Sequence, residues 1–189
     1  PEPMLQLRNQ GHILGPDGFR MSKSRGNVID PDEQVRDYGA DTVRAYLMFG
    51  YRWTEGGLWN VENIQGAVRW LNRVWTLVLE TAGADSADGD SADRRALVRK
   101  THQTIRAVSQ DLENFEFNTV VSSLMEFANS IGAARLEGLA GTEEFNAAIE
   151  ALLLLMAPVT PHIAEELWER LGKPYSIHSQ PWPEFDAEL

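Results

Sequence analysis

The chain has 189 residues, with 17 lysines and arginines against 28 aspartates and glutamates, a formal net charge of −11, and 43% hydrophobic residues. This size suffices for one core of ordinary size or two small ones, and no apolar run approaches the ~20 residues that a membrane span needs. The absence of cysteine excludes disulfides and thiolate metal sites, and it is compatible with the reducing cytoplasm, where we expect the protein to reside.

Two regions of the sequence differ in composition and in apolar periodicity. Residues 1–56 combine short apolar stretches with many glycines and prolines, whereas residues 57–189 carry long stretches of helical periodicity. We therefore predict a boundary at the glycine pair Gly56-Gly57. Residues 11–20 resemble the end of a strand and a loop without partner strands, and the chain begins at Pro1, so we expect a fragment of a longer protein.

Two short helices are predicted before the boundary. Asp30 can cap the first helix, Pro31 suits its first position, and Gly39 can end it. The second helix is predicted to begin at about Asp41. Its apolar side consists of Val43, Tyr46 and Leu47.

The second region predicts a helical bundle, because apolar residues recur there at intervals of three and four. The periodic stretches are 64–78, 98–112, 117–131, 145–156 and 163–171, and Pro158 separates the last two. Thr142 and Thr160 occupy positions suited to N-caps. Residues 82–93 are small and acidic, and we expect them to form a solvated, mobile connection.

The stretch GFRMSKSRGNVIDP, residues 18–31, concentrates positive charge in an acidic chain. Arg20, Lys23 and Arg25 alternate with serines and a glycine, whose hydroxyl and N–H groups can meet phosphate oxygens. A helix N-terminus, which favours anions, follows directly. The ordinary alternative is a solvated surface loop. The spacing of a P-loop is absent, so any phosphate contact would come from side chains on a mobile loop.

Residues 20–24, RMSKS, resemble the KMSKS signature of class I aminoacyl-tRNA synthetases, with arginine in place of the first lysine. The continuation RGNVIDPDEQVRDYGADTVRAYLMF is similar to the same stretch in the enzymes that activate leucine, isoleucine, valine and methionine. The stretches GGLWNVENIQGAVRWLNRVWTLV, LLLLMAPVTPHIAEELWERLG and SIHSQPWPEFDAEL are similar to the leucyl members. The valyl, isoleucyl and methionyl enzymes are the alternatives.

The resemblance covers essentially the whole chain and implies a mainly α fold. Residues 1–56 would end a nucleotide-binding catalytic domain, and residues 57–189 would form the anticodon-binding bundle of this class. The implied activity is the ATP-dependent activation of leucine and its transfer to tRNA(Leu). Magnesium would arrive with ATP, and no tightly bound metal, membrane or DNA is expected as a partner.

The resemblance also implies the residues of an ATP site. Lys23 would be catalytic, because a cation beside the departing pyrophosphate stabilises the negative charge that grows there. The implied ATP-binding residues are Arg20, Met21, Ser22, Lys23 and Ser24.

A pair of arginines forms the second predicted site. Arg69 and Arg73 lie one helical turn apart on one face, and the resemblance implies that they contact tRNA phosphates rather than read bases. The alternative is that Arg69 pairs with Glu62 or Glu80.

Cations also crowd the predicted start of the next helix, where the helix dipole disfavours them. They are Arg94, Arg95, Arg99 and Lys100. For Arg94 and Arg95 we expect ion pairs with the acidic connection. Trp75 and Trp168 fall on apolar stripes, and we expect both in the core.

The HIGH tetrapeptide, the other nucleotide-binding signature of the class, does not occur in the sequence, nor do counterparts of a leucine pocket or an editing domain. We therefore expect the 189-residue chain to fold but not to aminoacylate by itself. A different functional class remains as an alternative, namely a non-catalytic tRNA-binding module. The loop signature favours the enzyme, because a binding module has no use for a lysine that acts on pyrophosphate.

Overall fold

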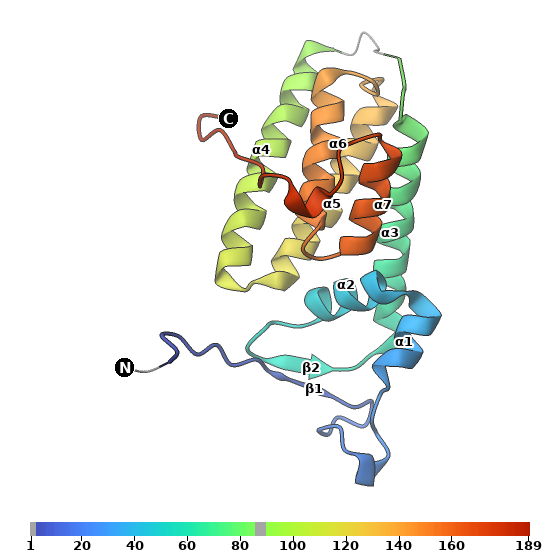
Figure 1. Cartoon of the computed structure of the whole chain (residues 1–189), viewed down its shortest axis with the longest axis vertical. Helices are drawn as coiled ribbons and strands as arrows, with labels where there is room; N and C mark the ends of the chain where they lie inside the picture. Colours follow the sequence, from blue (N-terminus) through green and yellow to red (C-terminus); the bar gives the residue numbers. More distant parts are fainter. Residues whose placement is uncertain (1–2, 86–89) are drawn as a thin grey trace.

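The structure is a computed structural model that describes residues 3–85 and 90–189. Figure 1 shows upright helices standing on a smaller lower part that contains a strand pair and two short helices. The lower part comprises β1 (His12–Leu14), a 3-10 turn (Lys23–Arg25), α1 (Pro31–Tyr38), α2 (Ala40–Gly50) and β2 (Gly56–Leu58). The bundle comprises α3 (Val61–Thr81), α4 (Ser91–Asn114), α5 (Phe117–Leu136), α6 (Glu143–Met156) and α7 (Pro161–Arg170). The predicted mainly α fold is confirmed.

The two strands form a parallel pair. His12 lies opposite Gly56, and Leu14 lies opposite Leu58. The prediction of a strand without a partner is therefore wrong, because α1 and α2 form a crossover that returns the chain beside β1. Gly56 has φ +69°, and a Cβ there would lie 2.1 Å from the His12 carbonyl oxygen, so this close approach requires glycine. The predicted division after residue 56 falls within β2 and stays a prediction.

The start and end of α1 agree with the sequence. The Asp30 side chain accepts a hydrogen bond from the N–H of Asp32 at 3.0 Å, and Pro31 holds the first helical position. Gly39 ends the helix with φ 84°. Because α2 begins at the next residue, the two short helices meet at this glycine.

The connection between α3 and α4 is shorter than the sequence suggests. Residues 86–89 of the predicted mobile connection lie outside the described residues. Asp90 accepts a hydrogen bond from the N–H of Ala92 at 2.7 Å, and α4 begins at Ser91, within the predicted connection and seven residues before its apolar stripe. Asp93 lies in the first turn, where an acidic side chain favours the helix dipole. Caps can thus start a helix before its apolar stripe begins.

Both predicted N-cap positions are confirmed, but only one of the two threonines caps its helix through its side chain. Thr142 accepts the N–H of Phe145 at 3.2 Å at the start of α6. Thr160 precedes α7, but its hydroxyl donates to the Met156 carbonyl oxygen at 3.3 Å and does not cap the helix. The N–H groups at the start of α7 donate instead to the carboxylate of Asp41, on α2.

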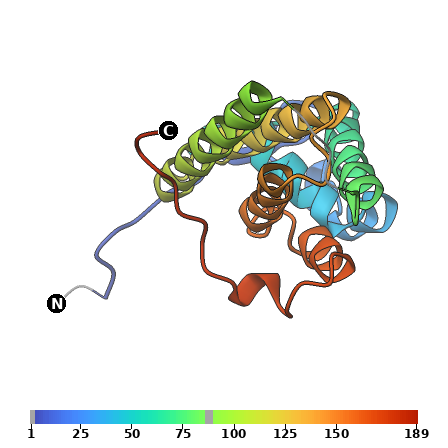
Figure 2. The ribbon, with the colours of Figure 1, turned by 90° about the horizontal axis from the view of Figure 1, so that it is seen from above.

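The bundle encloses one contiguous core that extends to α2. Figure 2, the view from above, shows α6 in the middle of the bundle with α4 and α5 on one side and α7 on another. Trp168 is buried, as predicted, and its indole N–H donates to the Pro174 carbonyl oxygen at 2.8 Å. Trp75 is only half-buried, and the guanidinium of Arg170 lies 4.9 Å from the centre of its ring.

No helix of the described residues is both long and apolar enough to cross a membrane.

Helix α2 joins the lower part to the bundle through two charged side chains. The buried carboxylate of Asp41 accepts the N–H of Ile163 at 2.7 Å and the N–H of His162 at 3.4 Å. Arg44 donates to the carbonyl oxygens of Val159 at 3.0 Å and Pro158 at 2.8 Å. The turn between α6 and α7 therefore depends on α2 for its hydrogen bonds.

We predict that Asp41→Ala lowers the free energy of unfolding by about 1–2 kcal/mol, because it removes a cap and leaves two partly buried N–H groups without their acceptor. Asp41→Asn, which keeps an acceptor oxygen, is expected to lose less. Urea denaturation measures both. Asp37→Ala is the control, because Asp37 is exposed on α1, and it should change stability by less than about 0.5 kcal/mol. Wild-type stability in Asp41→Ala would contradict the role of this cap.

Candidate functional site

The basic stretch forms a loop between β1 and α1 that extends from the bottom of the molecule (Figure 1). Ser22 precedes the 3-10 turn, and the N–H groups of Arg25 and Gly26 both donate to its carbonyl oxygen at 3.1 Å. Gly26 ends the turn with φ +70°, a conformation that favours glycine. The loop therefore has a defined shape around Lys23 rather than an extended one.

Asn27 holds the two sides of the loop together. Its side-chain oxygen accepts the N–H of Ser22 at 2.8 Å, and its amide donates to both carboxylate oxygens of Asp17, at 2.9 and 3.0 Å. The Asn27 amide, followed by the N–H of Phe19, holds the pKa of the Asp17 carboxyl below its ordinary value. Sequence reasoning missed both residues, although the pairs Asp17-Gly18 and Gly26-Asn27 are turn signals.

The side chains of the predicted ATP site divide into two groups. The side chains of Arg20 and Lys23 are exposed and make no hydrogen bond or ion pair with any residue that the structure describes. Ser22 and Ser24 share a hydrogen bond between their hydroxyls, at 2.8 Å. Met21 is partly buried, packs against the core and lines an apolar cavity of about 160 Å³ beside α2. The loop thus presents two unpaired cations and is anchored to the core by its methionine.

The predicted tRNA site lies on α3. Arg69 and Arg73 are exposed, and neither pairs with any residue in the described part of the chain. The alternative pairing of Arg69 with Glu80 is not formed, because Glu80 pairs with Arg135 of α5. Both guanidinium groups are therefore available to a partner outside the chain.

Two cations near the start of α4, unlike Arg69 and Arg73, form ion pairs within the bundle. Arg94 lies 3.9 Å from the carboxylate of Glu144 on α6, and Lys100 lies 3.7 Å from that of Glu126 on α5. Pairing of Arg94 and Arg95 with the acidic connection stays a prediction, because residues 86–89 lie outside the described residues. The α4 cations are thus engaged at least in part within the bundle.

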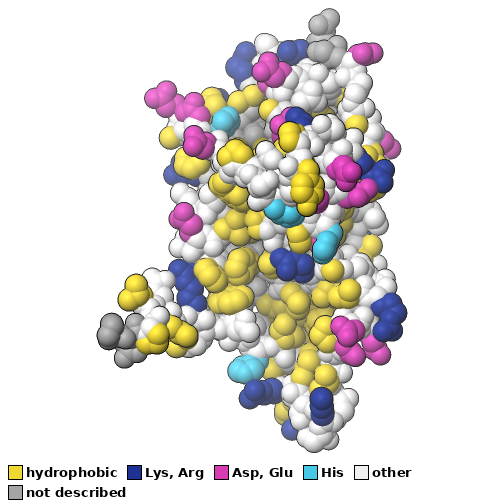
Figure 3. All heavy atoms as spheres, viewed as in Figure 1, with side chains coloured by type: hydrophobic (Ala, Val, Ile, Leu, Met, Phe, Trp, Pro, Cys, Tyr) yellow, Lys and Arg dark blue, Asp and Glu magenta, His cyan; other side chains and the backbone are white. Residues whose placement is uncertain are grey.

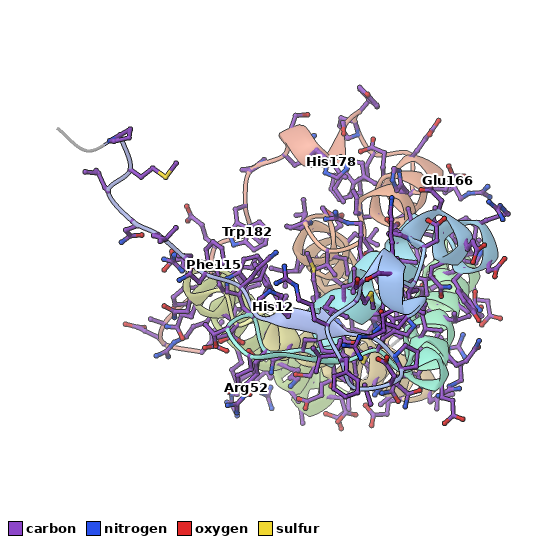
Figure 4. All side chains as sticks on the ribbon, turned by 90° about the horizontal axis from the view of Figure 1, so that it is seen from below. His12, Arg52, Phe115, Glu166, His178 and Trp182 are labelled. Atoms are coloured by element: carbon purple, nitrogen blue, oxygen red, sulfur yellow. The ribbon has the colours of Figure 1, made fainter. Side chains whose placement is uncertain are left out.

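An aromatic cluster forms a second contact between the lower part and the bundle. Trp53 packs edge-to-face on Phe115 and Phe117, with ring centroids 5.5 and 5.3 Å apart. Arg8 lies over the Phe115 ring at 4.2 Å. Phe115 itself has φ 64°, which is unusual for a residue with a side chain. Figure 4 labels Phe115 at the bundle end that faces the lower part, on the side of His12 and Arg52.

The face of the molecule shown in Figure 3 is mainly apolar where the bundle meets the lower part, and its lysines and arginines are scattered. A cavity of about 590 Å³ lies at this junction, between β1, α2 and the start of α5, and its lining includes Met48, Trp53 and Phe117. Within the residues that the structure describes, no group of histidines and acidic side chains is arranged to hold a metal ion.

Two family profiles match the chain. Residues 1–55 match the family described as tRNA synthetases class I (I, L, M and V), and residues 94–189 match the anticodon-binding domain of tRNA ligase. The second match covers more than half of the chain, so the chain belongs to the family of the anticodon-binding domain of tRNA ligase.

Among tRNA ligases, the chain is similar to leucine–tRNA ligases. It is 51% identical over 188 residues to that of Herpetosiphon aurantiacus and 45% identical over 186 residues to that of Deinococcus radiodurans. These alignments cover 100% and 98% of the chain but only 23% and 22% of the relatives. The chain therefore spans less than a quarter of the length of these relatives. The predicted resemblance to the leucyl members is confirmed.

Solved structures of two synthetases are also similar to the chain. The LeuRS of Agrobacterium radiobacter K84 (agnB2), in a ternary complex with tRNA and LeuAMS, matches with a TM-score of 0.89 and 31% identity over 99% of the chain and 25% of that protein's chain. The Mycobacterium tuberculosis methionyl-tRNA synthetase in complex with methionyl-adenylate matches with a TM-score of 0.69 and 17% identity, over 86% of this chain and 38% of its own. The second likeness concerns the fold alone.

We predict that Asn27→Ala raises the pKa of Asp17 toward its ordinary value of 3.8, because the largest stabilisation of the carboxylate is lost. With a depressed pKa in the folded protein, this contact contributes stability above pH 3.8, and the contribution is lost as the pH falls through the lower folded-state pKa. Carbon-detected NMR titration of the Asp17 carboxyl measures the shift. Ser24→Ala, which leaves the Asn27 contact intact, is the control. An unchanged pKa in Asn27→Ala would show that the amide does not hold the carboxylate.

Proposed function

We propose that this chain supplies two working parts of a leucine–tRNA ligase. Residues 1–56 end the catalytic domain and carry the loop at residues 20–24, and residues 57–189 form the bundle that binds tRNA(Leu). The whole enzyme activates leucine with ATP, which enters with Mg²⁺, and transfers leucine to tRNA(Leu) in the cytoplasm. The observation that carries the proposal is the RMSKS loop, whose two cations are exposed and unpaired among the described residues.

The chemistry of the first step needs a cation at this position. The carboxylate of leucine attacks the α-phosphate of ATP, and negative charge grows on the pyrophosphate as its bond to the α-phosphate breaks. The ammonium group of Lys23 is compact and can approach those oxygens closely. Such a contact, made mainly in the transition state, raises the rate without tightening the binding of the substrates.

The neighbours of Lys23 have supporting roles in this proposal. Arg20 offers a planar fork that can hold a phosphate by two hydrogen bonds, and Ser22 and Ser24 offer hydroxyls. Met21 contributes by anchoring the loop in the apolar cavity rather than by contact with ATP. The Asn27 bridge supports the same idea, because it fixes the turn without using either cation.

The second part of the proposal concerns tRNA. The net charge of −11 disfavours general binding to polyanions, so recognition must rely on local charge. Arg69 and Arg73 provide two unpaired cations one turn apart on α3. The presence of tRNA in the complex of the Agrobacterium relative is consistent with this role.

We expect Lys23→Ala in the full-length protein to slow adenylate formation by ~10²-fold or more, equivalent to roughly 3 kcal/mol. The KM values for ATP and leucine should change much less, because the contact forms mainly in the transition state. Lys23→Arg should recover only part of the rate, because a guanidinium is broader than an ammonium. Pre-steady-state measurement of adenylate formation tests this.

Arg20→Lys is the matched control for Lys23→Ala. It restores the usual first residue of the signature and should be close to neutral. A Lys23→Ala enzyme that forms adenylate at the normal rate would leave the loop without the proposed role. The protein would then be better described as a non-catalytic tRNA-binding module.

For the tRNA site, Arg73→Ala should raise the KM for tRNA(Leu) and leave adenylate formation nearly unchanged. The slope of log affinity against log salt concentration should fall by about one, as the loss of one phosphate contact predicts. Arg69→Ala should behave in the same way. Arg106→Ala, at an exposed position of α4, is the control. If affinity and slope both stay at their wild-type values, these arginines do not contact the RNA.

A further inference from the structure

Two glycines in the middle of long helices have no role in the packing of the chain. Gly66 lies in α3 and Gly132 lies in α5, and a glycine inside a helix costs about 1 kcal/mol relative to alanine. Neither has a positive φ, so the backbone does not require glycine there. A Cβ at either position would meet no atom within 4 Å, so no neighbour requires it either. A reason for these glycines must be sought outside the chain.

Both glycines lie beside the proposed tRNA site. Gly66, Arg69 and Arg73 follow one another at intervals of three and four, so they share one face of α3. Gly132 lines a groove of about 590 Å³ between α3 and α5, and Arg73 lines the same groove. Figure 2 shows α3 and α5 next to each other on the side of the bundle opposite the C-terminal segment.

The groove has a floor of small residues and charged or polar edges. Gly132 and Ala133 have small side chains that leave the groove open, and Leu77 adds apolar surface. Arg73 stands on the α3 edge without a partner among the described residues, whereas Arg135 on the α5 edge is paired with Glu80. Asn129 is exposed on the α5 side and can donate or accept a hydrogen bond.

We infer that this groove seats the sugar–phosphate backbone of an RNA strand and that Gly132, in its lining, allows that backbone to approach closely. Gly66, outside the groove, would allow the same approach on the α3 face that carries Arg69. The inference rests on the proposed binding of tRNA to α3. Arg69 and Arg73, four residues apart, are separated by about 6 Å along the helix, close to the separation of successive phosphates in an RNA strand. Riboses fit against a low apolar floor, and Asn129 suits their hydroxyl groups.

The ion pair at the end of the groove has a consequence for affinity. Glu80 neutralises Arg135 and brings a negative charge close to the path of the strand. Glu80→Gln removes this charge and leaves the Arg135 guanidinium available to phosphate. It should therefore tighten the binding of tRNA(Leu) several-fold, an effect that misfolding cannot produce.

The main test is Gly132→Leu in the full-length protein. A Cβ at this position meets no protein atom within 4 Å, and leucine suits a helix better than glycine, so the Tm should not fall. The affinity for a tRNA(Leu) transcript, measured by fluorescence anisotropy at fixed salt, should fall at least ~10-fold. Gln103→Leu, which adds the same side chain at an exposed position of α4, should leave the affinity unchanged.

The outcomes separate the inference from the proposed function. If Arg73→Ala weakens binding but Gly132→Leu does not, the groove is not the RNA path, although α3 still binds tRNA. If neither variant weakens binding, both ideas fail. Should Gly132→Leu lower the Tm, Gly132→Ala decides instead, with an expected two- to three-fold loss of affinity and a Tm at or above that of the wild type. Unchanged or weaker binding by Glu80→Gln would also count against the inference.

Discussion

The position of the RMSKS loop relative to the bundle depends on one pair of charged side chains in α2. Asp41 accepts from the N–H groups that begin α7, and Arg44 donates to the carbonyl oxygens that precede it. The N–H groups are those that the start of a helix leaves unpaired, and the two carbonyl oxygens belong to the turn before it, where a polar group without a partner is costly. One helix thus completes the backbone hydrogen bonding of a turn that lies more than a hundred residues further along the chain. Because α1 and the loop precede α2 directly, the cations of the loop are fixed to the bundle through this contact.

The aromatic cluster is a second contact between the lower part and the bundle, in addition to the hydrogen bonds of Asp41 and Arg44. Trp53, in the segment after α2, packs on Phe115 and Phe117 at the turn between α4 and α5. Between the two contacts, the Tyr46 hydroxyl pairs with that of Tyr51 at 2.7 Å and accepts the N–H of Asn60 at 3.0 Å. Burial, and after it the hydrogen bond with Tyr46, raises the pKa of Tyr51, so the Tyr51 phenol stays neutral. Three separate contacts therefore hold the lower part and the bundle in one orientation.

The sequence predicts what depends on local pattern. Apolar periodicity located the five helices of the bundle, and Asp30, Gly39 and Thr142 marked helix ends correctly, because these signals act within a few residues. Thr160 also occupies its predicted N-cap position, but the side chain that accepts the N–H groups there is Asp41, which is remote in sequence and is not revealed by a single sequence. The partner of β1 was missed for the same reason. At the candidate site, the motif identified the cations of the loop, but the Asn27 bridge and the groove between α3 and α5 depend on tertiary structure.

Phe115 illustrates a conflict between local and tertiary preference. Its backbone adopts a conformation that glycine or asparagine would hold with less strain, whereas its ring packs on Trp53 and Phe117 and lies under Arg8. A residue that relieved the backbone would remove the ring contacts, and another aromatic side chain would keep the strain. The turn between α4 and α5 is thus a locally frustrated point of the fold, where the best residue for the backbone and the best residue for the packing are different amino acids.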